Sequence, residues 1–380
     1  MKKSTSYDVI VIGVGGMGSA AVAQLARRGQ RVLGLEGFDI PHRFGSSHGV
    51  NRIIRLAYYE HSSYVPLLRR SYELWSDLEN DCGEQLLHVT GSVDAGPEND
   101  GLFKGSVRSC REHGLEHEVL DAADLAKRFP GYRLAEGTMA CFQPAGGFLR
   151  SERCIVRFVM AAQRAGAFVR AREKVLGWEP VGDGVTVTTQ RGTYEAARLV
   201  ITAGAWTRQL LPNLSIEAVP ERQVLGWFQP IKPELFRPDV FPVFNLQVDE
   251  GRYYGFPVFE VPGFKIGRYH HLEEVVDPDR QSSEISEEDE EILRVVTRRY
   301  FPDADGPTMA LSTCMFTNTP DEHFLIDTLP EAPQVSVAAG FSGHGFKFCS
   351  VVGEILADLA IDGDTSHDIS KFRLTDRPLD

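Results

Sequence analysis

The chain has 380 residues, 42% of them hydrophobic and 24% charged, and its formal net charge is −13. This length favours two domains over one compact core, and the negative charge argues against nucleic acid or an anionic membrane as a partner. The sequence has no apolar run of about 18 residues, and the N-terminal MKKSTSYDV lacks the apolar core of an export signal. We therefore expect a globular cytoplasmic protein with no membrane span.

The cysteines and the acidic stretches give no sign of a metal site. None of the six cysteines forms a C-x-x-C pair, so zinc and thioredoxin-type sites have no support, and we expect reduced thiols. The densest acidic stretch, 284–291 (EISEEDEE), is interpreted as the solvated start of a helix. The cysteines are Cys82, Cys110, Cys141, Cys154, Cys314 and Cys349.

The first elements along the chain form a strand, a turn, a helix and a second strand. The apolar run 9–12 predicts a buried parallel strand, 19–28 a helix, and 31–35 the next strand. Between the first strand and the helix stands a G-x-G-x-x-G turn. With a strand before it and a helix after it, this turn predicts dinucleotide binding rather than a glycine-rich structural turn.

Each glycine of that turn has a mechanical purpose in this interpretation. Gly13 permits the tight turn, Gly15 lets the main chain approach a pyrophosphate, and Gly18 lets the helix pack closely on the strand. Glu36 follows Gly18 by 18 residues, where a carboxylate can accept hydrogen bonds from ribose hydroxyls. This stretch alone leaves FAD and NAD both open.

The next segment is irregular and then becomes helical. Residues 37–67 are rich in glycine, serine and histidine and can lie across a bound cofactor, and 66–75 predict the start of a helix. Arg52 and Arg55 are three residues apart, which would place them on one face of a helix. Without other evidence, two such arginines indicate a solvated salt-bridge surface.

The middle of the chain alternates between helices and strands. Residues 86–146 predict strand followed by helices at 105–117 and 122–128, and 148–173 predict a helix and a strand. A hairpin and a buried strand at 199–202 end in Ala203-Gly204-Ala205-Trp206. A strand and glycine turn at this point commonly return to the dinucleotide in flavoproteins, so Gly204 favours FAD over NAD.

The last third changes pattern twice. Residues 217–319 contain short aromatic segments separated by proline and glycine, which predict an antiparallel sheet and a plausible substrate-binding layer. Residues 335–363 then predict a strand, a glycine loop and a helix that return to the cofactor domain.

Six blocks, taken together and in order, resemble the family of monomeric sarcosine oxidase and N-methyltryptophan oxidase. The resemblance runs from Tyr7 to about Phe372 and implies an amine-oxidising flavoenzyme with FAD held covalently through a cysteine sulfur. The blocks are GSSHGVNRIIR at 45–55, YYGFP at 253–257, KIG at 265–267, CMFT at 314–317, DEHF at 321–324 and AGFSGHGFKF at 339–348.

The resemblance also implies a fold of the α/β (α+β) class. It consists of a glutathione-reductase-like Rossmann FAD-binding domain with an inserted antiparallel-sheet substrate domain. We assign 1–85, 147–216 and 320–380 to the FAD-binding domain, and 86–146 and 217–319 to the substrate-binding and catalytic domain.

The same resemblance assigns roles beside the flavin. Cys314 matches the cysteine joined to the flavin 8-methyl carbon, with Cys349 as the fallback. Lys265 matches the lysine that promotes reaction of reduced flavin with oxygen through a water. Arg52 matches an arginine near the flavin ring, and His48 matches a histidine against it.

Other matches concern the substrate. Arg55 and Lys347 correspond to the pair that holds the substrate carboxylate, which overturns the surface interpretation of Arg55. Tyr254 matches a substrate-side tyrosine. His270 is the expected active-site histidine, but G-R-Y-H-H is one residue longer than the family's spacing, so His271 remains an alternative.

The glycine loop near the end of the chain is expected to face the flavin. Main-chain N–H groups at Gly343 and Gly345, and the helix after them, would stabilise negative charge on reduced flavin. His344 has a packing role or a catalytic role in this interpretation. Both remain open.

Several positions depart from sarcosine oxidase. Phe316 stands where that enzyme has a tyrosine, and Asn245 where it has a pocket methionine. Val50 and Asn51 replace the usual Asp-Thr. The clamp and oxygen-activating residues are retained while the pocket lining varies, which predicts the same reaction class with changed selectivity.

The resulting prediction is an oxidase of secondary amino acids, such as sarcosine or another N-methyl amino acid. It would release the demethylated amino acid, formaldehyde and hydrogen peroxide, with oxygen as co-substrate, as a monomer. The alternatives are a cyclic (proline- or pipecolate-like) amino acid oxidase, a fructosyl amino acid oxidase, and a flavin amine dehydrogenase that passes electrons to another acceptor. A non-enzymatic binding role is the remotest possibility.

Overall fold

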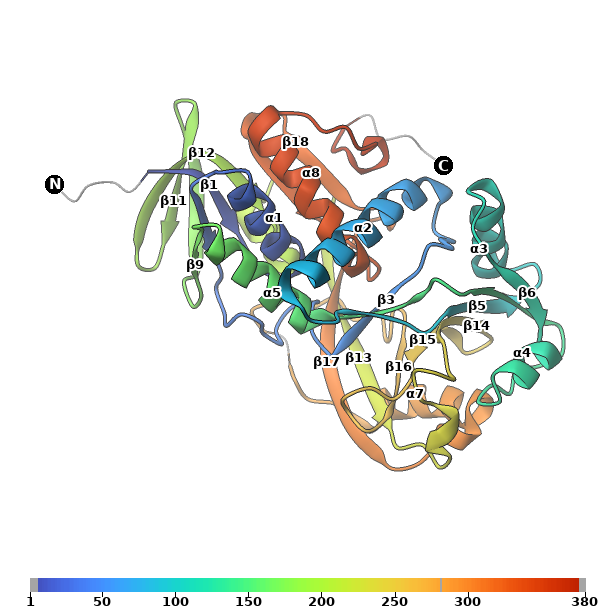
Figure 1. Cartoon of the computed structure of the whole chain (residues 1–380). Helices are drawn as coiled ribbons and strands as arrows, with labels where there is room; N and C mark the ends of the chain where they lie inside the picture. Colours follow the sequence, from blue (N-terminus) through green and yellow to red (C-terminus); the bar gives the residue numbers. More distant parts are fainter. Residues whose placement is uncertain (1–5, 281, 376–380) are drawn as a thin grey trace.

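The protein is described by a computed structural model that covers residues 6–280 and 282–375 (Figure 1). Residues 1–5, on which the expectation of no export signal partly rests, lie outside the described residues. The chain forms two large sheets with helices around them, and a small third sheet lies between (Figure 1). The described residues include no helix that is long and apolar enough to cross a membrane.

The first sheet has a parallel centre made from segments far apart in the sequence. β1 pairs in parallel with β2 on one side and with β12 on the other, and Ile12 stands opposite both Leu35 and Ile201. β9 extends the sheet beyond β2, and β19 pairs in parallel with the end of β12. The strands are β1 (Ser6–Ile12), β2 (Val32–Leu35), β9 (Phe168–Arg170), β10 (Val175–Val181), β11 (Gly184–Thr189), β12 (Gly192–Ile201), β18 (Leu325–Leu329) and β19 (Ala332–Ala339).

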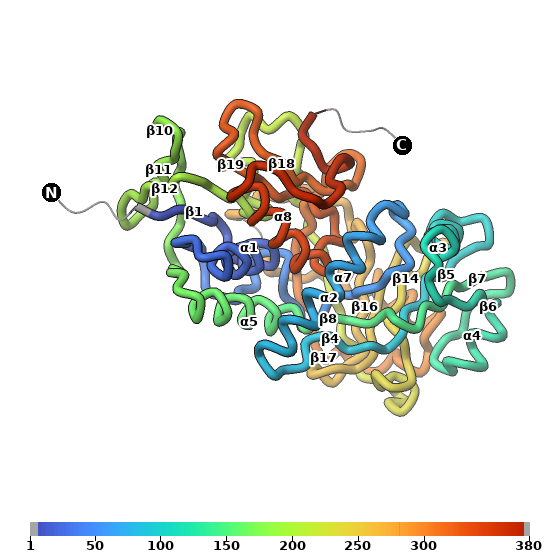
Figure 2. The backbone as a smooth tube through the Cα atoms, turned by 45° about the horizontal axis from the view of Figure 1, so that its top comes forward, coloured from blue at the N-terminus to red at the C-terminus, as the bar shows by residue number. Residues whose placement is uncertain are grey.

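One face of this sheet carries α1 (Gly16–Arg27), which packs between α5 (Ser151–Arg164) and α8 (Cys349–Asp362). The first and last segments of the chain therefore lie side by side (Figure 2). Small residues make the close contact possible: a β-carbon at Gly353 would lie 2.6 Å from Ala20 Cβ. The predicted strand–helix–strand start and the predicted return of the C-terminal helix are both confirmed.

The second sheet contains eight strands in the order β17-β13-β16-β15-β14-β5-β7-β6. All neighbours are antiparallel except β14 and β5, which pair in parallel where the 86–146 segment joins the 217–319 segment. The expected antiparallel sheet is thus mixed at one point. Its strands are β5 (Ser92–Pro97), β6 (Glu118–Asp121), β7 (Thr138–Gln143), β13 (Val219–Phe228), β14 (Val243–Val248), β15 (Gly251–Phe256), β16 (Phe264–Arg268) and β17 (Thr308–Asn318).

Helices border this second sheet. α3 (Gly101–Glu112) and α4 (Ala122–Arg128) lie at its β5–β6 end, and α7 (Glu287–Tyr300) packs beside β16 (Figure 1). α7 begins within the acidic stretch, as predicted, and Ser286 and Asp289 form a reciprocal capping box at its start. The division of the chain into two domains stays a prediction, although long β13 and β17 run from one sheet toward the other (Figure 1).

The third sheet corrects one expectation. β3 (Asn51–Ile54), β8 (Gly147–Arg150) and β4 (Leu87–Val89) pair antiparallel, and α2 (Val65–Cys82) follows. Arg52 therefore lies on a strand with Arg55 just beyond its end, and the idea of a shared helical face is wrong. The β-branched pair Ile53-Ile54 favours the strand, and three-residue spacing on a strand separates two side chains to opposite faces.

Candidate active site

The glycine turn has the geometry that each glycine was expected to supply. Gly13 has φ +85°, and a β-carbon there would lie 2.5 Å from the carbonyl oxygen of Thr202. A β-carbon at Gly18 would lie 1.8 Å from the carbonyl oxygen of Gly13, so any side chain would push α1 off the strand. A β-carbon at Gly15 would meet no atom within 4 Å, because this position opens into a cavity.

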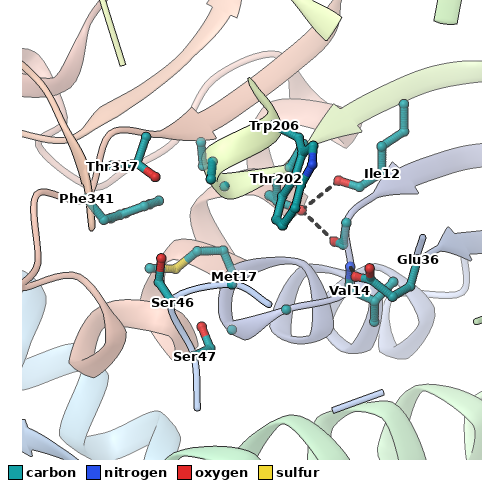
Figure 3. A pocket seen from close by; sticks show the side chains of 18 of the residues that line it. Ile12, Val14, Met17, Glu36, Ser46, Ser47, Thr202, Trp206, Thr317 and Phe341 are labelled. Atoms are coloured by element: carbon teal, nitrogen blue, oxygen red, sulfur yellow. Dashed lines mark hydrogen bonds between the residues drawn. The ribbon is translucent and has the colours of Figure 1, made fainter. Parts of the chain in front are cut away.

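Glu36 stands at the end of β2 and lines the same cavity. Its carboxylate accepts hydrogen bonds from Val14 N (2.8 Å) and Phe38 N (3.1 Å), which fix it beside the turn. Figure 3 shows Glu36 and Val14 at one end of the cavity and Thr317 and Phe341 at the other. The cavity thus runs from the predicted ribose acid past the N-terminus of α1 to the C-terminal glycine loop.

Two buried polar atoms near this cavity lack a hydrogen-bond partner in the described part of the chain, and one of them belongs to a lining residue. His48 Nε2 and Thr317 Oγ1 are buried and have no hydrogen-bond partner among the described residues. Burial without a partner costs a polar atom free energy, and Thr317 lines the cavity directly. The hydroxyl of Thr317 and the open position at Gly15 fit a dinucleotide cofactor in this cavity.

Gly204, Gly343 and Gly345 also line the cavity. Gly204 (φ +54°) follows β12, and a β-carbon there would meet no atom within 4 Å. Gly343 (φ +78°) lies under the ring of Phe316, whose Cε2 would be 2.5 Å from a β-carbon at this position. The structure therefore brings the two predicted returning turns to the cavity of the first glycine turn.

Arg52 lines the cavity at the side of the 45–55 segment. Its guanidinium donates to the carbonyl oxygens of Asn51 (2.9 Å) and Ser46 (2.7 Å). The main-chain N–H groups of Gly49 and Val50 donate to Glu152 Oε1 at 2.7 and 3.1 Å. These contacts fix the segment that contains His48, and burial together with nearby Arg52 lowers the pKa of His48 to about 3, so its imidazole is neutral.

Lys265 lies on β16 with a side chain that is only 1% exposed. Its Nζ donates to Gly49 O (2.7 Å), Asn51 O (2.9 Å) and Asn51 Oδ1 (2.8 Å). Asn51 therefore accepts two of these three hydrogen bonds of the ammonium group. Burial and then Arg52 lower the pKa of Lys265 well below its ordinary value. Lys265 thus joins the second sheet to the loop beside the cavity.

Arg55 and Lys347 both lie against the ring of Tyr58, and their role as a clamp stays a prediction. The guanidinium of Arg55 lies 4.6 Å from the centre of the Tyr58 ring, and Lys347 Nζ lies 5.2 Å from the same centre. Both cations are buried. Lys347 Nζ donates to His344 O at 2.7 Å, and burial followed by repulsion from Arg55 lowers the pKa of Lys347 to about 7.

Two acids that sequence reasoning missed neutralise this pair. Glu60 accepts two hydrogen bonds of 2.9 Å from Arg55 Nη2, and Asp94 Oδ1 lies 3.7 Å from Arg55 Nε. Burial opposes ionisation of Glu60, yet the pKa of this acid is lowered to about 2 by Arg55. Neither acid belongs to a recognisable motif. The one sequence signal is that Asp94 stands between the apolar residues Val93 and Ala95, which indicates that its carboxylate is buried and needs a partner.

Asn245 does not contact Arg55 directly. Its Nδ2 donates to Asp94 Oδ1 at 2.7 Å, and Ser106 Oγ donates to Asp94 Oδ2 at 2.6 Å. The amide that replaces a pocket methionine therefore acts through Asp94 on the arginine. Its role in substrate binding stays a prediction.

Tyr254, Phe316 and Tyr269 form an aromatic wall. The ring centres of Tyr269 and Tyr254 are 5.0 Å apart, and those of Tyr269 and Phe316 are 5.7 Å apart. Phe316 lines the cavity, and burial raises the pKa values of both tyrosines, so their hydroxyls are neutral. Sequence reasoning named Tyr254 and Phe316 and missed Tyr269.

The two candidate histidines point elsewhere. His270 Nδ1 lies 3.1 Å from both Glu221 oxygens and its Nε2 lies 3.0 Å from Glu322 Oε1, and the carboxylates raise its pKa to about 9. His271 is fully buried, with Nε2 3.1 Å from Asp289 Oδ1, and burial lowers its pKa to about 4. Tyr269, which precedes His270, belongs to the aromatic wall, and the choice between His270 and His271 stays a prediction.

Cys314 lies on β17 and packs with Tyr254 and Phe316 in one buried cluster. Residues 314 and 316 share one face of the strand because side chains alternate. Burial raises the pKa of Cys314, whereas Arg52 and then Lys265 oppose that shift. Cys349 lies at the start of α8, where its Sγ would be 2.7 Å from a β-carbon at Gly16 beside the first glycine turn.

The parallel sheet, the glycine turn with its acid, and the cavity that runs from Glu36 to the C-terminal glycine loop define a dinucleotide-binding protein. Residues 8–359 match the family described as DAO, FAD dependent oxidoreductase. The chain belongs to this family, its cofactor is FAD, and the expected Rossmann FAD-binding fold is confirmed.

Relatives of known name cover almost the whole chain. It is 43% identical over 376 residues to a monomeric sarcosine oxidase of Streptomyces avermitilis, which covers 97% of both chains. It is 36% identical over 371 residues to an N-methyl-L-tryptophan oxidase of Yersinia pestis, with 97% of this chain and 98% of that one covered. The predicted family resemblance is thereby confirmed.

Solved structures support the same fold. NikD, an unusual amino acid oxidase essential for nikkomycin biosynthesis, superposes with a TM-score of 0.84 at 28% identity over 97% of both chains. Glycine oxidase from Geobacillus kaustophilus superposes with a TM-score of 0.81 at 21% identity, over 98% of this chain and 100% of that one, and shows the fold alone.

Proposed function

We propose that the protein oxidises a secondary amino acid, sarcosine or another N-methyl amino acid, to the demethylated amino acid, formaldehyde and hydrogen peroxide. The observation that carries the proposal is the buried pair Arg55 and Lys347, whose side chains both lie against the ring of Tyr58. Two cations out of water suit one carboxylate. The named relatives, oxidases of sarcosine and of N-methyl-L-tryptophan, support the same substrate class.

The clamp works by exchange of one carboxylate for another. Glu60 already occupies Arg55 Nη2, so a substrate carboxylate competes with Glu60 for the guanidinium while Asp94 stays at Nε. Arg55 thereby keeps a counter-charge throughout. Lys347 has a pKa of about 7, and an arriving carboxylate favours its protonated form.

The aromatic wall orients the other end of the substrate. Tyr254, Tyr269 and Phe316 contact one another, and Phe316 reaches the cavity. We assign to Tyr269 the place that was expected for His270, since His270 is held by two carboxylates outside this wall. These rings exclude water from the amine and its methyl group. Bound FAD supplies the two-electron acceptor for the carbon–nitrogen oxidation.

Oxygen serves as the final acceptor in this proposal, with Lys265 as its positioning cation. Lys265 is held by three oxygen acceptors from the segment beside Arg52. A fixed cation there stabilises negative charge that develops on oxygen. The protein is taken to act as a monomer, in keeping with the name of its relatives.

We propose further that FAD is attached through Cys314. The thiol belongs to the cluster of the aromatic wall, whereas Cys349 packs at the phosphate end beside Gly16. Acid-precipitated wild-type protein should stay yellow, and Cys314→Ser should release its flavin into the supernatant. Cys349→Ser is the matched control and should keep the yellow pellet. A yellow pellet from Cys314→Ser would refute the assignment.

The substrate class is tested by hydrogen peroxide release. We expect N-methyl amino acids to give peroxide and formaldehyde in equal amounts, and cyclic amino acids to give little of either. Peroxide without formaldehyde from proline or pipecolate would replace the proposed class. Turnover with an artificial electron acceptor but without peroxide would remove oxygen as the acceptor.

A further inference from the structure

Trp206 lines the FAD cavity at the end marked by Glu36. It follows the Gly204 turn, and its ring centre lies 5.2 Å from that of Phe38, which also lines the cavity. Figure 3 shows the indole on the same side of the cavity as Val14 and Glu36, away from Thr317 and Phe341. Beyond the ribose that Glu36 marks, the next group of the cofactor is its adenine.

A carboxylate from the other half of the chain holds this indole. Trp206 Nε1 donates to Asp279 Oδ1 at 2.8 Å, and Gln209 Nε2 donates to Asp279 Oδ2 at 3.1 Å. Lys174 Nζ lies 3.3 Å from both oxygens of Asp279. All three donors come from the FAD-binding sheet and its turns, and Asp279 itself lines the cavity.

The segment that carries Asp279 is tied to the second sheet and has a hydrogen bond within its own turn. Val276 N donates to Pro220 O at 3.0 Å, which ties the segment to β13 of the second sheet. Within the turn, Asp277 Oδ1 accepts from Asp279 N at 3.0 Å. Residues 276–279 thus lead from the second sheet to the indole.

We propose that Trp206 is the platform on which the adenine of FAD stacks, and that Asp279 is a positioning residue that fixes the indole for this contact. An aromatic ring is the usual partner of a base face. One hydrogen bond of 2.8 Å at Nε1 and the packing on Phe38 fix the plane of the indole before the cofactor arrives. The adenosine subsite is therefore completed by a residue from the substrate-binding half.

The test uses apoprotein in the Cys314→Ser background, with ADP as the probe, because ADP carries the adenosine and both phosphates without flavin. Trp206→Ala should weaken ADP binding, measured by calorimetry, at least about fivefold, since one base–aromatic stack is worth roughly that or more. Trp206→Phe should retain most of the affinity. Inorganic pyrophosphate, which has no base, should bind equally to Trp206→Ala and to the parent.

The positioning role of Asp279 is tested by a separate set of variants. Asp279→Ala should weaken ADP binding severalfold, and Asp279→Asn should restore it because the amide oxygen still accepts from the indole. Asp39→Asn is the matched control, since Asp39 is an exposed acid paired with Arg172 that does not line the cavity. This control should bind ADP like the parent.

ADP affinity unchanged in Trp206→Ala, or an equal loss for pyrophosphate, overturns the platform. A loss in Trp206→Ala without any loss in Asp279→Ala overturns the positioning role. If Trp206→Ala gives no folded apoprotein, the ADP affinities of Asp279→Ala and Asp279→Asn are compared instead. Asp279 has an exposed side chain, so its replacement leaves the core intact. Equal ADP affinity in those two variants and the parent then overturns the proposal.

Discussion

The two ends of the FAD cavity are built in different ways. At the phosphate end, one contiguous stretch supplies main-chain atoms packed so tightly that a β-carbon added at Gly18 would lie 1.8 Å from the carbonyl oxygen of Gly13. At the other end, Arg52 lines the cavity and contacts Asn51, which also accepts from the buried Lys265. Arg55 and Lys347 are buried against the ring of Tyr58. The first end depends on shape and is encoded locally. The second depends on charge and on partners that the fold brings in.

Removal of Arg55 breaks the charged end most strongly. Arg55→Ala leaves Glu60 and Asp94 buried without their cation. We expect the affinity for methylthioacetate, a carboxylate inhibitor, to fall about 10²- to 10³-fold and the free energy of unfolding to fall by about 3–5 kcal/mol. Flavin difference spectra and denaturant unfolding measure the two effects.

Arg70 offers a matched control for that prediction. It forms ion pairs with Glu73 and Glu354 at a partly exposed position, so Arg70→Ala should cost about 1 kcal/mol or less. Equal effects of the two replacements, or unchanged inhibitor affinity in Arg55→Ala, would contradict the clamp.

Replacement of Lys265 separates oxygen chemistry from substrate chemistry. Lys265→Met keeps the apolar stem but removes the ammonium, so reoxidation of reduced flavin by oxygen should slow about 10²-fold. Anaerobic reduction by substrate should change far less, and stopped-flow absorbance measures both steps. Lys232→Met, a change of an exposed lysine that does not line the cavity, should alter neither rate. Equal slowing of both steps in Lys265→Met would remove the assigned role.

Two glycines test the phosphate end, where shape decides. Gly18→Ala places a methyl group 1.8 Å from Gly13 O, so the free energy of unfolding should fall by about 1–3 kcal/mol. Gly15→Ala meets no atom within 4 Å and should leave apoprotein stability unchanged while weakening FAD binding. Thermal unfolding and flavin titration of apoprotein in the Cys314→Ser background make the comparison. Loss of stability in Gly15→Ala, or none in Gly18→Ala, would contradict the account.

Proton uptake at Lys347 is the smallest expected effect. Its pKa is lowered to about 7, by burial first and Arg55 second, so it loses its charge as pH rises above that value. The affinity for methylthioacetate should therefore be constant below pH 7 and fall up to about tenfold per pH unit above pH 7.

His344 and Glu60, which lie beside Lys347 and have pKa values of about 4 and 2, do not titrate in this range. Flavin difference spectra between about pH 6 and 8.5 measure the effect, and Lys347→Met should abolish it. A slope that persists in this variant would assign the proton elsewhere.

The comparison also explains how much the sequence could predict. The phosphate end was readable because strand, turn and helix are fixed by local spacing, and Gly13, Gly18 and Glu36 lie where the pattern places them. Arg55 looked like a surface residue until the family resemblance was considered. Nothing local shows that Glu60 and Asp94 converge on it.

The aromatic wall shows a second limit of prediction from the sequence. The sequence offers two histidines after Lys265, and the choice between them stays a prediction. In the structure Tyr269 packs against Tyr254, and His270 contacts Glu221 and Glu322. β16 ends at Arg268 and His270 has a positive φ of 52°, so strand alternation does not predict where Tyr269 and His270 point. Trp206 was visible only as the end of a glycine turn, since its partner Asp279 lies 73 residues away.

The central claim is that this FAD enzyme oxidises secondary amino acids through a carboxylate clamp. The most direct measurement is peroxide release from sarcosine and from its methyl ester at one pH, with formaldehyde assayed in the same samples. We predict equal amounts of peroxide and formaldehyde from sarcosine and a far lower kcat/KM for the ester, which lacks the carboxylate charge. Equal kcat/KM for the two compounds, or no peroxide from any N-methyl amino acid, would contradict the account.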